Sequence, residues 1–234
     1  MAIDTKERTF EEEIEYCLTS TGKKSEKYVK GSPADFDRRL AMDTKAVISF
    51  IKDTQPDKWS DLCKRHGADV GEGFLKRLNA ELNNRGMIDV LRHGITDLGV
   101  EVRLAFFKPG SGMNKSATAL YEKNVLQITR QVKYSEANDN SIDSVIFLNG
   151  LPIITIELKN PLTGQTYKNA IVQYQNDRNP REALLAFKKR ALVHFAVDTE
   201  EVWMTTKLQR LDTVFIPFNR GYKAVSYTHL RAHE

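Results

Sequence analysis

The stretch SIDSVIFLNGLPIITIELKNPLTG, residues 141–164, decides the fold of this chain. Two mostly apolar runs flank the turn signal Asn149-Gly150, so we expect residues 143–147 and 153–159 to pair as an antiparallel hairpin. The apolar surroundings leave three polar side chains unexplained, and these are Asp143, Glu157 and Lys159.

The register of this hairpin decides which of its polar side chains share a face. A two-residue turn sets Asp143 opposite Ile156 and leaves Glu157 on the other face of the sheet. A three-residue connection, or a bulge at Gly150, instead pairs Asp143 with Glu157 on one face. Lys159 shares the face of Glu157 in either case, because side chains alternate along a strand.

Two carboxylates that face each other repel, and burying them without compensation costs several kcal/mol. A divalent cation removes this cost, and Mg²⁺ takes one or two carboxylates together with water and phosphate oxygens. We therefore expect Asp143, Glu157 and the backbone carbonyl of Leu158 to bind Mg²⁺. Lys159 would orient a water molecule or stabilise the transition state of phosphodiester hydrolysis. The alternative is a solvated strand edge with a weak Glu157–Lys159 ion pair.

The rest of the chain predicts helices that frame a mixed sheet, of the α/β or α+β class. The spacing of apolar residues favours helices when it follows a 3.6-residue period and strands when it alternates. By this criterion we expect helices at 10–22, 114–122, 167–176 and 181–190, a helical insertion at 35–92, and further strands at 99–109, 125–135, 191–198 and 201–208.

Composition narrows the class of protein further. The chain has 234 residues, a net charge of +4 and no apolar run of the roughly 20 residues that a membrane-spanning helix needs. Its first residues are polar and acidic, unlike a signal peptide, so we expect a cytoplasmic protein without a membrane partner. The only cysteines, Cys17 and Cys63, are too few and too far apart for a zinc site or a disulfide framework.

The motifs FLNGLP and IELKNPLTGQT, with the sequence that follows them to VWMTT, resemble the N-terminal nuclease region of the restriction subunit of type I restriction-modification enzymes. That region is similar to nucleases of the PD-(D/E)XK superfamily. The resemblance extends upstream through DFDRRLAMDTKAVISFIKDTQPDKW, RGMIDVLRHG and RQVKYS. It implies a restriction-endonuclease-like core with a helical insertion after the first helix.

The resemblance also implies roles for individual residues. Asp143 corresponds to the motif aspartate, and Glu157 with Lys159 corresponds to the E-x-K pair. Glu11 matches an acidic residue that assists metal binding in related nucleases, although Glu12 and Glu13 compete for this role.

Many members of the superfamily carry a Gln-x-x-x-Tyr motif that contacts DNA near the cut. Tyr174 fits the tyrosine, whereas Ala170 stands where the glutamine belongs and Gln173 is only adjacent to Tyr174. Packing of Tyr174 on the sheet is the alternative. Lys168 lies in the basic stretch KNPLTGQTYK and is expected to contact DNA phosphates, unless that stretch is a solvated face.

The function that the resemblance implies is Mg²⁺-dependent cleavage of unmodified double-stranded DNA, coupled in the parent protein to ATP-driven translocation. Methylation and specificity subunits would be the partners. This sequence contains no G-x-x-x-x-G-K-[ST] phosphate loop, so ATP is expected for the parent protein alone. The alternatives are a stand-alone repair or junction nuclease and a non-catalytic DNA-binding module.

The expected domain organisation is an endonuclease domain at 1–224, with the parent's motor domains missing from this chain. Residues 225–234 resemble a translated sequencing adapter and are expected to be a non-native tail.

Overall fold

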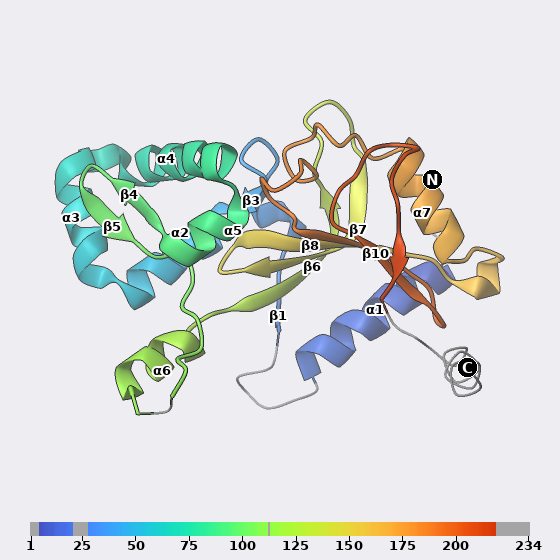
Figure 1. Cartoon of the computed structure of the whole chain (residues 1–234), viewed down its shortest axis with the longest axis horizontal. Helices are drawn as coiled ribbons and strands as arrows, with labels where there is room; N and C mark the ends of the chain where they lie inside the picture. Colours follow the sequence, from blue (N-terminus) through green and yellow to red (C-terminus); the bar gives the residue numbers. More distant parts are fainter. Residues whose placement is uncertain (1–4, 21–27, 112, 219–234) are drawn as a thin grey trace, which may run out of the picture.

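The computed structural model describes residues 5–20, 28–111 and 113–218, so the expected tail at 225–234 lies outside the described residues. The chain forms a seven-stranded mixed sheet in the order β1-β6-β7-β8-β9-β10-β11, flanked by helices (Figure 1). The β1–β6 and β8–β9 pairs are parallel and the other neighbours antiparallel, which confirms the expected mixed α/β class. The strands are β1 (Val29–Lys30), β6 (Leu126–Lys133), β7 (Ser141–Leu148), β8 (Leu151–Leu158), β9 (Val193–Val197), β10 (Val202–Thr205) and β11 (Ile216–Pro217).

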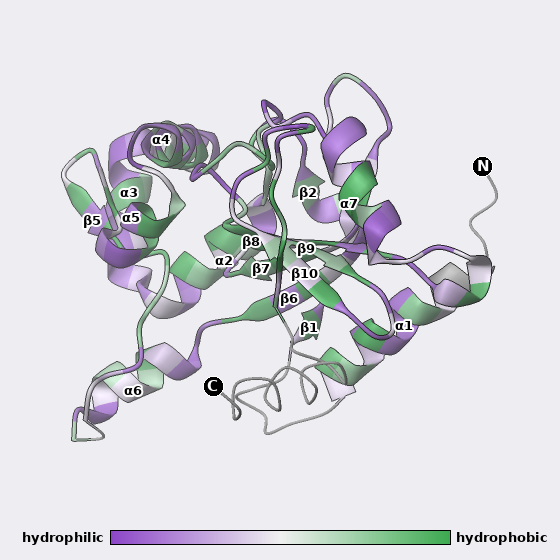
Figure 2. Ribbon diagram, turned by 45° about the vertical axis from the view of Figure 1, so that its right-hand side comes forward, coloured by the Kyte–Doolittle hydropathy of each residue, from purple (hydrophilic) through white to green (hydrophobic). Residues whose placement is uncertain are grey.

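Opposite faces of this sheet are covered by α1 (Thr5–Ser20) and α7 (Tyr167–Asn176). On one face, Phe10 and Ile14 of α1 pack against a cluster that contains Ile156. On the other face, the Tyr174 hydroxyl of α7 lies 2.9 Å from Thr155 Oγ1. Figure 2 shows α7 and α1 on either side of the strands, each with a mixture of hydrophilic and hydrophobic residues along its length.

A helical lobe lies at one side of the sheet (Figure 1) and has its own apolar core. It consists of α2 (Thr44–Thr54), α3 (Pro56–His66), η3 (Gly67–Asp69), α4 (Val70–Arg85) and α5 (Met87–His93), with the hairpin β4 (Ile95–Asp97)–β5 (Val100–Val102). The hairpin β2 (Phe36–Asp37)–β3 (Met42–Asp43) precedes the lobe in the chain, and Phe36 packs against Phe147 of the main sheet. The expected insertion at 35–92 is therefore helical only from Thr44 onward. The strand expected at 99–109 shrinks to β5, which pairs with β4 outside the main sheet. Outside the lobe, α6 (Lys115–Glu122) and the 3-10 helices η2 (Pro33–Asp35) and η4 (Pro161–Thr163) complete the fold.

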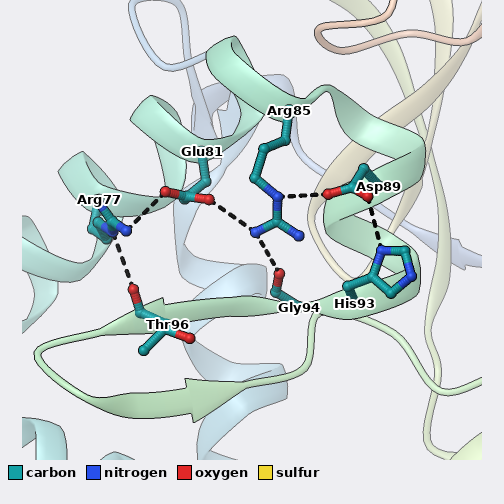
Figure 3. A network of polar contacts seen from close by, with 7 residues as sticks. All are labelled: Arg77, Glu81, Arg85, Asp89, His93, Gly94 and Thr96. Atoms are coloured by element: carbon teal, nitrogen blue, oxygen red, sulfur yellow. Dashed lines mark hydrogen bonds and ion pairs between the residues drawn. The ribbon is translucent and has the colours of Figure 1, made fainter.

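Charged side chains tie α4, α5 and β4 together within the lobe (Figure 3). Arg85 lies at the centre, where Nη1 donates to Glu81 Oε2 at 2.8 Å and to the Gly94 carbonyl at 3.0 Å. Its Nε donates to Asp89 Oδ2 at 2.5 Å. Arg77, two turns earlier, donates from Nε to a backbone carbonyl of β4 at 3.1 Å. The network fixes the β4–β5 hairpin against the helices.

The β7–β8 hairpin combines a two-residue turn with a bulge. Asn149 and Gly150 have φ values of +52° and +84°, as a type I′ turn requires, and Leu148 pairs with Leu151. The register then shifts by one residue inside β8, where Ile153 is the extra residue. The expected three-residue connection or bulge at Gly150 is therefore wrong in position, because the extra residue lies three positions further along.

The turn packs so closely against the start of α2 that it leaves no room for a side chain at Gly150. A Cβ on Gly150 would lie 2.5 Å from the Asp43 carbonyl oxygen and 2.6 Å from the Val47 nitrogen. The Asp43 N–H donates to the Gly150 carbonyl at 2.9 Å. Asp43 also caps α2, since its Oδ1 accepts from the Ala46 N–H at 2.9 Å. The hairpin turn and the start of α2 therefore form one contact.

The helix expected at 181–190 is absent, and the segment is a series of turns. Leu184 and Leu185 are both buried, and Lys188 adopts a left-handed φ of +67°, which a continuous helix does not allow. The buried Arg190 that follows donates from Nε to the Leu40 carbonyl at 3.0 Å. Contacts with the rest of the molecule therefore override the local helical pattern.

No helix in the described ranges of the chain combines the length and the apolar character needed to cross a bilayer.

We predict that Gly150→Ala lowers the free energy of unfolding by roughly 3 kcal/mol, because it adds both left-handed strain and a clash. Gly164→Ala is the matched control, since Gly164 has a φ of +78° but no atom within 4 Å of an added Cβ. It should cost about 1 kcal/mol. Urea unfolding measures both, and equal losses would show that the close approach at Gly150 is unimportant.

Candidate functional site

Asp143 on β7 and Glu157 on β8 lie at the same end of two neighbouring strands. Beyond the bulge, the ladder pairs Ser144 with Ile156, so the next pair in register sets Asp143 opposite Glu157. The Leu158 N–H donates to Asp143 Oδ2 at 2.8 Å, which holds the aspartate against β8. The bulge at Ile153 therefore produces the juxtaposition that a two-residue turn alone would have prevented.

Glu157 is completely buried, and its two oxygens have different surroundings. Oε1 accepts a hydrogen bond of 2.7 Å from Arg178 Nε, whereas Oε2 has no hydrogen-bond partner. Burial, followed by the charge of Asp143, raises the pKa of Glu157 well above its usual value, although Arg178 opposes the shift. A second positive charge next to Oε2 would offset the electrostatic cost of keeping Glu157 ionised.

Arg178 is a functional-site residue that sequence reasoning missed. It is 4% exposed, and its guanidinium carbon lies 5.7 Å from the centre of the Tyr134 ring. Burial acts to lower the pKa of Arg178, but the Glu157 carboxylate outweighs it and the pKa is raised. Breaking a buried pair of this kind typically costs about 3–5 kcal/mol. An arginine within the polar run NDRNPR carries no local signal of burial.

Gln131 on β6 connects Asp143 to α1. It lies between the Arg130–Ser144 and Val132–Ile142 pairs of β6 and β7, and its φ of +51° interrupts the ladder there. Gln131 Nε2 donates to Glu11 Oε1 at 2.8 Å and contacts Asp143 Oδ1 at 3.4 Å. Its Oε1 accepts from Ser141 Oγ at 3.0 Å, which fixes the orientation of the amide. The structure thus places Gln131 beside the carboxylates.

The structure distinguishes the three glutamates that compete for the auxiliary acidic role. Glu11 is 2% exposed and reaches the site through Gln131. Glu12 and Glu13 are exposed, and Glu12 forms an ion pair of 3.5 Å with Arg130. Of the three, Glu11 is the residue that shares a hydrogen-bond donor with Asp143.

Lys159 follows directly after β8 and is 9% exposed. Its N–H donates to the Val197 carbonyl at 2.9 Å, so the extended pairing with β9 continues through this residue. Because residues two apart on a strand share a face, Lys159 lies on the side of Glu157.

The donor set at this place fits a hard divalent cation. Among the residues that the structure describes, no three His, Cys, Asp or Glu side chains gather closely enough to hold a metal ion by themselves. Mg²⁺ does not require three, because it is commonly bound by one or two carboxylates and keeps several waters. The unpartnered Glu157 Oε2 beside Asp143, with the Leu158 carbonyl as the expected further ligand, matches this pattern.

Tyr174 does not occupy the DNA-contacting position that the Gln-x-x-x-Tyr pattern suggested. Its side chain is 0% exposed within a core cluster, and its hydroxyl lies 2.9 Å from Thr155 Oγ1. The same Thr155 oxygen lies 2.7 Å from His194 Nδ1. The packing alternative is therefore the correct one, because a residue whose ring and hydroxyl are enclosed cannot reach a ligand from solvent.

The two other expected DNA contacts lie on the same helix but nearer to solvent. Lys168 is exposed and Gln173 is half-buried. Both are accessible, and their roles remain predictions.

Comparison with known families adds an independent finding. The family model described as type I restriction enzyme R protein N terminus matches residues 48–213. The match includes Asp143, Glu157 and Lys159 together with most of the helical lobe, whereas Glu11 lies outside it. No curated protein matches the chain.

The buried His194 predicts how stability depends on pH. Burial lowers its pKa to about 4, so the folded protein excludes a proton that the unfolded chain binds below pH 6.5. The resulting stabilisation is present above pH 6.5 and is lost as the pH falls towards 4, by up to about 3 kcal/mol. Urea unfolding at several pH values should show a flatter profile for His194→Gln than for the wild type. Identical slopes for His194→Gln and the wild type would refute the prediction.

Proposed function

Because the chain belongs to the family of type I restriction enzyme R protein N-terminal regions, we propose that it is a Mg²⁺-dependent DNA endonuclease domain of such an enzyme. The observation that carries the proposal is the pair Asp143 and Glu157, which meets on one face of the sheet with a buried, unpartnered carboxylate oxygen. A pair of like charges is unfavourable in the protein interior, and a bound cation is one way to offset the repulsion.

In this proposal Asp143 Oδ1, Glu157 Oε2 and the Leu158 carbonyl hold Mg²⁺, which when bound supplies charge neutralisation at the scissile phosphate and a more acidic water. Lys159, on the same side as Glu157, orients the attacking water or stabilises the charge that develops on the phosphate oxygens. Attack forms a new bond between the water oxygen and phosphorus. The attacking water gives up a proton to solvent, the bond from phosphorus to the leaving oxygen of the DNA strand breaks, and that oxygen takes up a proton from solvent.

The proposed substrate is unmodified double-stranded DNA. The accessible Lys168 and Gln173 on α7 are proposed to contact the DNA backbone, and each charged contact would add salt-dependent affinity that is independent of sequence. Methylation and specificity subunits are the proposed partners in the complete enzyme. There, cleavage would be coupled to ATP-driven translocation by the parent protein.

We predict that Asp143→Asn, Glu157→Gln and Lys159→Met each reduce Mg²⁺-dependent cleavage at least about 100-fold, because each removes a metal ligand or a charge aimed at the reacting phosphate. The assay is linearisation of plasmid DNA by the reconstituted restriction enzyme that carries this domain, with circular dichroism to check folding. Arg181→Met, which changes an exposed charge on the segment after α7, should cleave like the wild type.

Retained cleavage in any of the three variants would contradict the role given to that residue. If the wild type binds DNA but does not cleave with Mg²⁺ in the complete enzyme, the domain is a binding module and not a nuclease.

A second prediction concerns the acidic residues of α1. Glu11→Gln should lower cleavage about tenfold at limiting Mg²⁺, because Glu11 shares the Gln131 amide with Asp143. Glu13→Gln should have no effect, since Glu13 is an exposed glutamate two residues away on the same helix. Equal activities of the two variants over a Mg²⁺ titration would exclude Glu11 from the site.

A further inference from the structure

Arg178 occupies a specific place at the candidate metal site that the proposed chemistry leaves unexplained. It comes two residues after the last residue of α7, Asn176, in a loop rather than in a regular element. Its Nε nevertheless reaches the interior and donates to Glu157 Oε1 at 2.7 Å. Both side chains are nearly or completely buried, at 4% and 0% exposure.

The backbone that leads into Arg178 is anchored by two hydrogen bonds of the preceding residue, Asp177. The N–H of the preceding Asp177 donates to the Gln173 carbonyl at 2.9 Å, and the Asp177 carbonyl accepts from Asn140 Nδ2 at 3.5 Å. Asn140 directly precedes β7, the strand of Asp143. The loop is therefore tied to the same end of the sheet as the two carboxylates.

The guanidinium itself has a fixed orientation. Its carbon lies 5.7 Å from the centre of the Tyr134 ring, at a distance that favours attraction between a cation and an aromatic face. Tyr134 is 1% exposed and belongs to the same core cluster as Tyr174 of α7, so neighbouring core side chains enclose the ring. The ring supports the guanidinium of Arg178, and the guanidinium in turn holds the Glu157 carboxylate.

The contact with Arg178 makes the two oxygens of Glu157 unequal. Oε1 is occupied, and Oε2 is left as a buried oxygen with no hydrogen-bond partner, next to the Asp143 carboxylate. An ion pair that served stability alone would gain from bonding both oxygens, since arginine can bind a carboxylate through two parallel hydrogen bonds. Here only one oxygen is bonded, and the other remains available.

We propose that Arg178 is a positioning residue that holds Glu157 through Oε1 and thereby presents Oε2, together with Asp143, to a divalent cation. This inference rests on the proposed function and extends it to a residue outside the E-x-K motif. Arg178 does not touch the metal or the DNA. It acts through Glu157, as the partners of metal-ligating side chains commonly do.

The test measures metal binding without DNA. Mn²⁺ serves as the probe, and its binding to the purified 234-residue chain is followed by electron paramagnetic resonance of free Mn²⁺. Arg178→Met and Arg178→Gln should weaken Mn²⁺ binding at least about tenfold, and Arg178→Lys should recover part of the loss. Arg181→Met is the matched control, because Arg181 is an exposed arginine three residues away, and it should bind like the wild type.

A second readout separates positioning from general damage. In the reconstituted enzyme, the Mg²⁺ concentration for half-maximal cleavage should rise at least about tenfold in Arg178→Gln, while cleavage at saturating Mg²⁺ stays within about threefold of the wild type. Circular dichroism identifies variants that do not fold. If Arg178→Met is among them, Arg178→Gln decides the question by the same criteria.

The outcomes distinguish this inference from the proposed function. One outcome is that the wild type binds Mn²⁺, that Asp143→Asn abolishes this binding, and that both neutral Arg178 variants bind normally. This outcome overturns the positioning role of Arg178 and leaves the metal site in place. If the wild type itself binds no Mn²⁺ and does not cleave, the proposed function fails and this inference fails with it. Tighter Mn²⁺ binding by the neutral variants would also overturn the inference, because it would show that Arg178 competes with the cation.

Discussion

The local arrangement at the site depends on one electrostatic constraint, which is that two carboxylates face each other on neighbouring strands of a buried sheet. Asp143 and Glu157 cannot both remain charged in such surroundings without positive charge or hydrogen-bond donors nearby. Arg178 meets part of this demand at Glu157 Oε1, and the Leu158 N–H and Gln131 meet part of it at Asp143. The remaining deficit is concentrated at one buried oxygen, where a cation would bind.

The hairpin reconciles two requirements that conflict in a regular ladder. Packing against the start of α2 demands a tight turn with glycine at its second position, because the Asp43 carbonyl approaches Gly150 closely. A tight two-residue turn in regular register, however, would separate Asp143 and Glu157 onto opposite faces. The extra residue at Ile153 restores the shared face after the turn has been made. The bulge is therefore what brings the two carboxylates onto one face of the sheet.

Residues far apart in the sequence complete the site from both sides of the sheet. Glu11 comes from α1, on one face, and Arg178 comes from the loop after α7, which covers the other. The two helices could be predicted from their periodicity, and so could their packing on the sheet. Their contributions to the site could not be predicted. In the sequence, Glu11 is one of three consecutive glutamates and Arg178 lies in a polar loop, so both look like solvated charges until the fold buries them. Tyr174 shows the reverse case, since a motif match suggested a surface role and the structure encloses the residue completely.

The sequence by itself determined the hairpin, the mixed α/β class and the identity of the acids and the lysine, because strand alternation, turn chemistry and unexplained polar residues are local properties. It also carried the family match. Only the tertiary structure decided the register, the burial of Arg178 and the loss of the helix at 181–190. Register depends on a bulge at Ile153, three residues after a glycine that packs against the start of α2, and burial depends on which surfaces meet. Both are fixed by packing between segments that lie far apart in the chain, which no local pattern records.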